Sequence, residues 1–159
     1  MKTALYCGSF DPITLGHVDI AERSAALFDQ VTFAIFDKPL KHLTFTPEQR
    51  FQLAVESLAH LENVNVTLYH GLTTQYATEI GANALIRGIR TVNDYDKEMQ
   101  YALANRHLAP DIDTVCFFTN QDFAFVSSSL IKEIAMNGGE VSHLVSQPVL
   151  AALKDVYGL

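Results

Sequence analysis

The chain has 159 residues, of which 48% are hydrophobic and 18% charged, and its formal net charge is −7. This length suits one domain, predicted to span residues 1–159, and the negative charge argues against unspecific nucleic-acid binding. No apolar stretch approaches the ~20 residues of a membrane span, and we expect neither a signal peptide nor a membrane partner, hence a cytoplasmic protein.

Strand and helix patterns alternate along the first 118 residues. Short apolar runs predict five strands buried on both faces: Ala4–Cys7, Val31–Phe36, Val64–Tyr69, Ala84–Ile86 and Thr114–Phe118. Helical patterns cover Gly16–Phe28, Pro47–His60, Thr74–Ile80, Asn93–Leu108 and, after the last strand, about Ser129–Asn137 and Gln147–Tyr157. The alternation predicts an α/β fold: a Rossmann-like, doubly wound domain with a five-stranded parallel sheet and C-terminal helices.

Local signals support these elements. Thr46-Pro47-Glu48-Gln49 is a capping box with proline at the first helical position, and Gly81 is expected to end a helix in the left-handed region. Cys7 and Cys116 lie far apart in apolar runs, so we expect two buried, reduced thiols rather than a zinc site or a disulfide.

The segment GSFDPITLGH, at 8–17, is long for a turn and rich in residues with special chemistry. Open α/β sheets bind ligands beyond the carboxyl ends of their strands, where this loop is expected to lie. Gly8 lets the backbone approach a ligand, Ser9 offers a hydroxyl, and Asp11 can accept from main-chain N–H groups. Gly16 and His17 begin a helix whose free N–H groups suit a phosphate. An ordinary loop with a surface histidine would not explain this convergence.

Three other loops at the same predicted edge carry basic or hydroxyl side chains. Arg87 and Arg90 follow a buried strand and suit bidentate phosphate contacts, although surface arginines are the plainer alternative. The serines at 127–129 begin a helix and exceed what N-capping requires. Lys41 is either a phosphate ligand or part of a solvated basic loop.

These segments resemble the motifs of a known enzyme superfamily. Thr14-Leu15-Gly16-His17 matches the [HT]xGH signature of the nucleotidylyltransferases, and the string from Gly8 to His17 is similar to the bacterial phosphopantetheine adenylyltransferase family. That family usually carries threonine where this chain has Ser9. The segment 86–90 resembles the family's IRGxR, and 126–132 resembles its ISSSxxK/R. The resemblance covers essentially the whole chain.

The resemblance implies an activity and a set of site residues. The activity is transfer of AMP from ATP to 4′-phosphopantetheine, giving dephospho-CoA and pyrophosphate by direct in-line attack without a covalent enzyme intermediate. The implied catalytic residue is His17. The implied ATP-binding residues are Ser9, Phe10, His17, Gly88, Ile89, Arg90, Glu98, Phe123, Ala124, Phe125, Val126, Ser127, Ser128 and Ser129. The implied residues for the acceptor substrate are Ser9, Lys41, Thr73 and Arg87.

The resemblance also implies a cofactor and partners. Mg²⁺ is expected with ATP, without a protein metal site. Family members are commonly homohexamers and bind CoA as an inhibitor, so both properties are expected here. Met99 and Tyr101, on the fourth helix, suit either an interface or a core-facing stripe. Two alternative functions stay open: a nucleotidylyltransferase acting on nicotinamide mononucleotide or glycerol phosphate, and a non-catalytic nucleotide-binding module.

Overall fold

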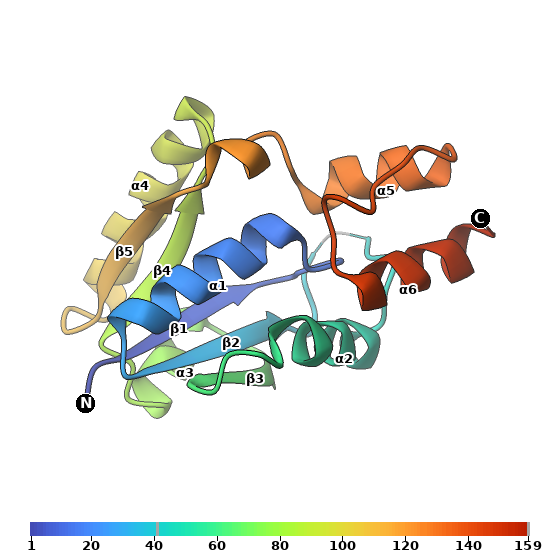
Figure 1. The fold of residues 1–159 in the computed structure, drawn as a ribbon. Helices are drawn as coiled ribbons and strands as arrows, with labels where there is room; N and C mark the ends of the chain where they lie inside the picture. Colours follow the sequence, from blue (N-terminus) through green and yellow to red (C-terminus); the bar gives the residue numbers. More distant parts are fainter. Residues whose placement is uncertain (41, 159) are drawn as a thin grey trace.

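The computed structural model describes residues 1–40 and 42–158, which form a central sheet covered by helices (Figure 1). The strands are β1 (Thr3–Gly8), β2 (Gln30–Phe36), β3 (Val64–Tyr69), β4 (Ala84–Ile89) and β5 (Asp113–Phe118). The helices are α1 (Leu15–Leu27), α2 (Pro47–Leu58), α3 (Thr73–Glu79), α4 (Val92–Leu108), α5 (Ser128–Met136) and α6 (Gln147–Tyr157), with a 3-10 turn at Gln121–Phe123.

The sheet confirms the predicted α/β fold. All strand pairs are parallel and their order is β3-β2-β1-β4-β5. The chain moves outward from β1 to β3, then returns to the other side of β1 for β4 and β5. The order therefore reverses between β1 and β4, which is where open parallel sheets bind their ligands, beyond the carboxyl ends of the strands.

Local sequence signals explain several helix ends. Thr46 and Gln49 form the predicted capping box of α2: the Thr46 hydroxyl accepts from the Gln49 N–H, and the Gln49 side chain accepts from the Thr46 N–H. Gly81, just after α3, has φ of +67°, the left-handed conformation predicted for it. Thr91 and Ser127 cap α4 and α5 through their hydroxyl oxygens.

The two faces of the sheet bury different sets of apolar side chains. Tyr6, Phe33 and Ile86 belong to the larger core, which also contains buried residues of α1, α2, α5 and α6. Leu5 and Leu85, on the opposite face, pack in a smaller core with Ala77 of α3 and its neighbours. Neighbouring residues of a strand point to opposite faces, so β1 contributes to both cores. Figure 1 shows α1 lying across the sheet and α6 running beside α2.

Three predictions about the sheet were wrong in detail. The edge strands β3 and β5 are not buried on both faces, because each has a neighbouring strand on only one side. Cys116, on β5, is exposed for the same reason, whereas Cys7 on the central strand is buried as predicted. The fourth strand continues past Ile86 to Ile89, because Ile89 still pairs with Phe118 of β5.

Helix α4 lies on the surface, which excludes one of the two alternatives predicted for Met99 and Tyr101. No residue of α4 is buried, and Met99 and Tyr101 are 45% and 48% exposed, so they do not form a core-facing stripe.

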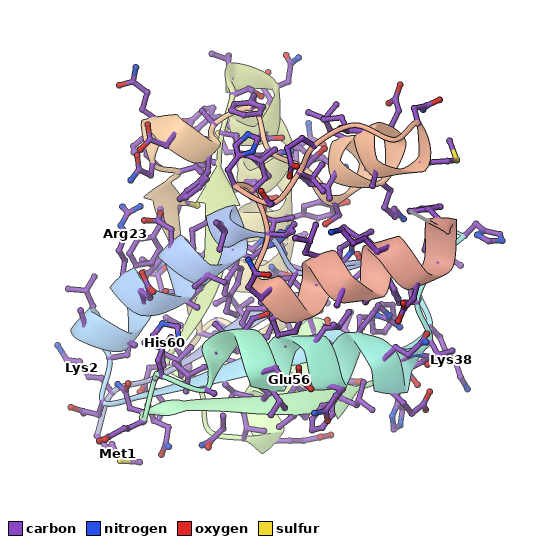
Figure 2. The ribbon with its side chains drawn as sticks, turned by 45° about the vertical axis from the view of Figure 1, so that its right-hand side comes forward. Met1, Lys2, Arg23, Lys38, Glu56 and His60 are labelled. Carbon is purple, nitrogen blue, oxygen red and sulfur yellow. The ribbon has the colours of Figure 1, made fainter. Side chains whose placement is uncertain are left out.

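His60 lies on the outer surface, where its Nε2 is 2.8 Å from Oε1 of Glu22 (Figure 2). In the described part of the chain, no helix combines the length and apolar character needed to cross a membrane.

Candidate functional site

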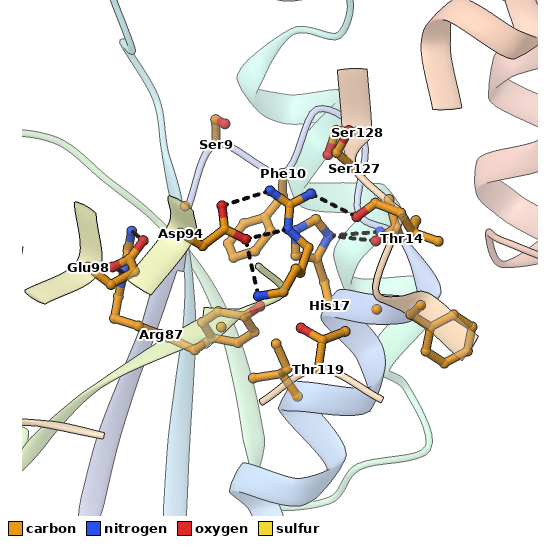
Figure 3. Close-up of a pocket in the computed structure, with 18 of the residues that line it drawn as sticks. Ser9, Phe10, Thr14, His17, Arg87, Asp94, Glu98, Thr119, Ser127 and Ser128 are labelled. Atoms are coloured by element: carbon orange, nitrogen blue, oxygen red, sulfur yellow. Dashed lines mark hydrogen bonds and ion pairs between the residues drawn. The ribbon is translucent and has the colours of Figure 1, made fainter. Parts of the chain in front are cut away.

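A cavity of about 540 Å³ opens at the carboxyl edge of the sheet, where the strand order reverses. Its walls come from the ends of β1 and β4, the first turns of α1 and α4, and the segment that leads into α5 (Figure 3). It is lined by Tyr6, Cys7, Gly8, Ser9, Phe10, Thr14, Gly16, His17, Ile20, Arg87, Gly88, Arg90, Asp94, Lys97, Glu98, Thr119, Phe123, Val126, Ser127, Ser128 and Ser129.

Most of the site residues implied by the sequence meet in this cavity. The residues brought together are Ser9, Phe10, His17, Arg87, Gly88, Arg90, Glu98, Phe123, Val126, Ser127, Ser128 and Ser129. The lining does not include Ile89, Ala124, Phe125 or Thr73. Ile89 is buried at the end of β4, and Phe125 is an exposed aromatic. The Thr73 hydroxyl lies 3.1 Å from the Tyr69 hydroxyl, and Lys41 lies outside the described residues.

His17 is held by the turn that precedes α1. Its Nδ1 accepts from the main-chain N–H of Thr14 at 3.0 Å and lies 3.0 Å from the Thr14 hydroxyl (Figure 3). Its ring stands edge-on to Phe10, with centroids 5.0 Å apart. Because Nδ1 acts as an acceptor toward Thr14, a neutral His17 carries its proton on Nε2. The turn therefore fixes both the ring orientation and the tautomer that can donate from Nε2.

The two arginines of the cavity are each bound by a carboxylate of α4. Glu98 receives two bonds from Arg87, at 2.6 and 2.8 Å, and Asp94 receives bonds from Nε, Nη2 and the main-chain N–H of Arg90. Burial lowers the pKa of Arg87, but the hydrogen bond to Glu98 together with the negative charges of nearby groups outweighs burial, so the pKa is raised overall. Burial raises the pKa of Asp94, yet bonds from Arg90 bring it below the usual value. The raised pKa of Arg87 and the lowered pKa of Asp94 both favour the charged forms of these two groups.

The serine segment is used partly for structure. Ser127 caps α5, with its hydroxyl accepting from the N–H of Leu130, and the Ser128 hydroxyl donates to the carbonyl of Pro12 at 2.8 Å. Lys132, one turn into α5, contacts Oδ2 of Asp11 at 2.5 Å. These contacts join the start of α5 to the loop after β1. The helix N-terminus consequently faces the same cavity as His17.

Gly88 marks a close approach between β4 and α1. A Cβ at this position would lie 2.5 Å from Cδ1 of Ile20, too close for any side chain without a shift of Ile20. Thr119 follows β5 beside it, and its hydroxyl oxygen is buried with no hydrogen-bond partner in the part of the chain that the structure describes. The cavity thus has an apolar floor of Ile20 and Gly88 beneath its charged walls.

Sequence reasoning missed several lining residues, among them Thr14, Ile20, Asp94, Lys97 and Thr119. Asp94 carried a usable signal, since it lies four residues after Arg90 at the start of a helix. Lys97 lies three residues beyond Asp94, on the same helix. Thr14 was quoted as part of the TxGH match, but its bond to His17 depends on the turn geometry. Ile20 and Thr119 carried no signal, because apolar helix residues and lone threonines are common everywhere.

The carboxylates of the cavity do not form a metal site by themselves. Mg²⁺ requires several oxygen ligands, but Asp94 and Glu98 are each engaged by an arginine. Within residues 1–40 and 42–158, no group of three or more His, Cys, Asp or Glu side chains is placed to hold an ion. Protein side chains alone therefore do not fit a Mg²⁺ cage.

A structural comparison supports the fold. The chain is similar to the crystal structure of a protein assigned as a nicotinate-nucleotide adenylyltransferase from Vibrio parahaemolyticus, with a TM-score of 0.72 over 99% of this chain and 96% of that one. The two sequences are 18% identical, so the likeness concerns the α/β fold alone.

Sequence comparisons are more specific. The family model described as cytidylyltransferase-like matches residues 5–134. Proteins named phosphopantetheine adenylyltransferase are 48% identical in Herpetosiphon aurantiacus, over 99% of this chain and 95% of the relative, and 49% identical in Roseiflexus sp. strain RS-1, over 99% of both. The protein of that name in Desulforudis audaxviator is 45% identical over 100% of this chain and 98% of its own length. The chain therefore belongs to the cytidylyltransferase-like family and, within it, to the phosphopantetheine adenylyltransferases.

Proposed function

We propose that the chain is a nucleotidyltransferase that transfers AMP from ATP to 4′-phosphopantetheine, giving dephospho-CoA and pyrophosphate in coenzyme A biosynthesis. One observation carries the proposal: His17, at the N-terminus of α1, faces Arg87 and Arg90 across one cavity, in a chain whose relatives of nearly equal length have this name. The arrangement suits two anionic substrates, because helix N-termini and guanidinium groups both stabilise phosphates.

The reaction needs no side-chain nucleophile. An oxygen of the acceptor phosphate, already ionised at neutral pH, attacks the α-phosphorus of ATP. The new P–O bond forms as the bond from the α-phosphorus to the bridging oxygen of the β-phosphate breaks, and pyrophosphate leaves with that electron pair. Catalysis then consists of positioning two anions and stabilising charge on the α-phosphate.

His17 is assigned to the α-phosphate. The bond from Thr14 N–H to Nδ1 leaves the ring proton on Nε2, so the imidazole donates from that atom. In this proposal the donation strengthens as negative charge collects on the α-phosphate oxygens in the transition state. Ser9 and Gly16 line the same cavity wall and are assigned to hold the nucleotide and acceptor there. The neighbouring N–H groups of Leu15 and His17 donate instead to the carbonyls of Leu144 and Thr14.

The remaining side chains divide between the two substrates. Arg87 is assigned to the acceptor phosphate, and Arg90 with the N-terminus of α5 to the β- and γ-phosphates. Glu98 and the aromatic ring of Phe123 are assigned to the nucleotide. Mg²⁺ that accompanies ATP would offset charge on the phosphates, and Asp94 and Glu98, each paired with an arginine, are not assigned to hold it. The assigned roles of Lys41, Thr73, Ile89, Ala124 and Phe125 stay predictions, as do the homohexamer, CoA inhibition and a cytoplasmic location.

A pyrophosphate-release assay tests the proposal. The protein is incubated with ATP, Mg²⁺ and 4′-phosphopantetheine, and release of pyrophosphate is compared with incubations in which nicotinamide mononucleotide or glycerol 3-phosphate replaces the acceptor. We expect turnover with 4′-phosphopantetheine alone. Turnover with a replacement acceptor instead would identify a sibling nucleotidylyltransferase, and ATP binding without turnover in any incubation would identify a nucleotide-binding module.

A further inference from the structure

Arg50 of α2 is an unusual arginine because its side chain is fully buried, at 0% exposure, and does not line the cavity. Its guanidinium donates to four main-chain carbonyls: those of Ser9 and Phe36 at 2.8 Å, Asp37 at 3.1 Å and Phe45 at 3.3 Å. We call these contacts the Arg50 clamp. They join the end of β2, the start of α2 and the loop after β1.

The clamp holds a buried charge without a direct ion pair. Among the residues that the structure describes, no carboxylate oxygen lies within 4.0 Å of the Arg50 guanidinium nitrogens. Burial lowers the pKa of Arg50, while the negative charges of Asp11, Asp37 and Glu48 act in the opposite direction. A buried cation is costly, but an apolar side chain in its place would leave the four carbonyls without this donor. The contribution of the guanidinium is therefore to hold these four carbonyls, and the segments that carry them, in fixed positions.

One of those carbonyls controls a donor of the cavity. The Ser9–Phe10 peptide is trans, so its N–H points opposite to its C=O. The carbonyl of Ser9 points inward to Arg50, and the N–H of Phe10 consequently points away from the interior, on the side where both residues line the cavity. Nothing in the described residues accepts a hydrogen bond from this N–H. Phe10 also has φ of +43°, a strained value for a residue with a side chain.

A second contact holds the clamp from the other side. Asp11 accepts from the main-chain N–H groups of Thr44 and Phe45, at 3.0 and 2.9 Å, while Arg50 binds the carbonyl of Phe45. Both main-chain polar groups of Phe45 are thus hydrogen-bonded, the N–H to Asp11 and the C=O to Arg50. The loop after β1 cannot turn the Ser9 carbonyl away from Arg50 without also moving the segment before α2.

We propose that Arg50 is a positioning residue for nucleotidyl transfer: by holding the Ser9 carbonyl, it aims the Phe10 N–H at the phosphate that reacts in the cavity. The inference rests on the proposed function. A backbone donor aimed at developing charge is worth most in the transition state, because it is already oriented when the charge appears. Loss of the clamp should therefore lower kcat more than it weakens substrate binding.

The test compares Arg50→Lys and Arg50→Gln with a matched control. Lysine keeps the charge but cannot span four carbonyls, and glutamine keeps one amide donor without the charge. We expect kcat to fall about 10-fold or more in both variants, with the KM values for ATP and 4′-phosphopantetheine within about 3-fold of wild type. Thr46→Ala is the control, because it breaks the capping box of the same helix without contacting Ser9.

Stability separates positioning from a merely structural role. Each variant is assayed well below its own Tm, and Thr46→Ala is expected to lose stability yet keep kcat within about 2-fold of wild type. A kcat for Arg50→Lys equal to that of the wild type would overturn the proposal. An equal loss of kcat in Thr46→Ala at a similar Tm would also overturn it.

A measurement on the unaltered protein keeps the proposal testable if neither Arg50 variant folds. In a ¹⁵N-labelled sample, the Phe10 amide should shift markedly when ATP is added, whereas the Phe45 amide, bound to Asp11, should not. An unmoved Phe10 amide at saturation contradicts the proposal. If wild-type protein releases no pyrophosphate in the assay, the proposed function fails, and this titration still decides whether Phe10 N–H binds phosphate.

Discussion

Arginines in two regions of the molecule are bound in different ways. Arg50 is fully buried and donates only to main-chain carbonyls. The side chains of Arg87 and Arg90 are 28% and 36% exposed in the cavity, and each donates mainly to a carboxylate, with one further bond to a carbonyl, that of Cys7 or Val126. Carbonyls are neutral and fixed by the fold, so they hold a guanidinium in one place. Carboxylates are anions on side chains, and a phosphate can replace them.

This difference distinguishes two parts of the molecule. In one, buried contacts fix the positions of the loops, and in the other, partly exposed arginines are placed to bind phosphate. The Arg50 clamp and the neighbouring Asp11–Lys132 pair link the loop after β1 to α2 and α5. The pairs of Arg87 and Arg90 with α4 keep two cations oriented in the cavity. Substitutions in the first part should change stability and, at Arg50, also kcat, whereas substitutions in the second should change substrate binding and turnover with little effect on stability.

The largest expected effect is on stability, from Asp11→Asn. The Asp11 side chain is 2% exposed and binds Lys132, so loss of its charge leaves a half-buried ammonium without its partner. We expect the free energy of unfolding at pH 7 to fall by about 3–5 kcal/mol, measured by urea denaturation. Asp155→Asn, an exposed change on α6, is the control and should stay within about 0.5 kcal/mol of wild type.

The same variant should change how stability depends on pH. Burial raises the pKa of Asp11, but bonds from Lys132 and from the Thr44 and Phe45 N–H groups bring it below the ordinary 3.8. A carboxyl with a lowered pKa in the folded state stabilises above its unfolded pKa, and this stability is lost as pH falls through the folded value. Wild-type stability should drop more steeply than that of Asp11→Asn below about pH 4. Parallel curves would show that this pair does not control acid sensitivity.

His17→Ala tests the proposed role of the cavity in turnover. The change removes the proposed donor to the α-phosphate, and loss of one such donor lowers kcat by about 10²–10³-fold. The KM for ATP should change far less, because the bond matters most in the transition state. Pyrophosphate release at saturating substrates measures this, with His60→Ala on the outer surface as control. Near-normal turnover would remove His17 from the mechanism.

The sequence predicted the fold better than it predicted the cavity. Periodicity and the TxGH segment led to the parallel sheet and to His17 at the start of α1, because both are local patterns. The exposure of Cys116 was missed, since sequence order does not reveal that β5 is an edge strand. Arg50 was missed because an arginine in a helix is usually solvated, and its four acceptors lie in segments that only the fold brings together.

Asp94→Asn is expected to have a smaller effect, on nucleotide binding. Asp94 occupies Arg90, which is assigned to the β- and γ-phosphates, so its negative charge competes with the triphosphate. We expect the KM for ATP to fall by about 2–5-fold, with stability changed by less than about 1 kcal/mol because the pair is partly exposed. Steady-state kinetics at low and high salt measure the shift, which should shrink as salt screens the charge.

A matched variant on the same helix isolates the charge effect. Asp96→Asn removes the same charge from an exposed position of α4 that does not line the cavity. Its KM for ATP should stay within about 1.5-fold of the wild-type value. A higher KM for ATP in Asp94→Asn would contradict exchange of the carboxylate for phosphate, and would mean that Asp94 orients Arg90 instead.

The smallest expected effect comes from Thr119→Val, in the cavity wall just after the edge strand β5. The Thr119 hydroxyl oxygen is buried and has no hydrogen-bond partner in the described part of the chain, so valine of the same shape removes an unsatisfied polar group. We expect the free energy of unfolding to stay unchanged or to rise by up to about 1 kcal/mol. Thr3→Val is the matched control: its hydroxyl donates to the carbonyl of Gly81 at 2.7 Å, so the same substitution should destabilise by about 1 kcal/mol. Equal losses in the two variants would mean that the Thr119 hydroxyl has a bonding partner in solution.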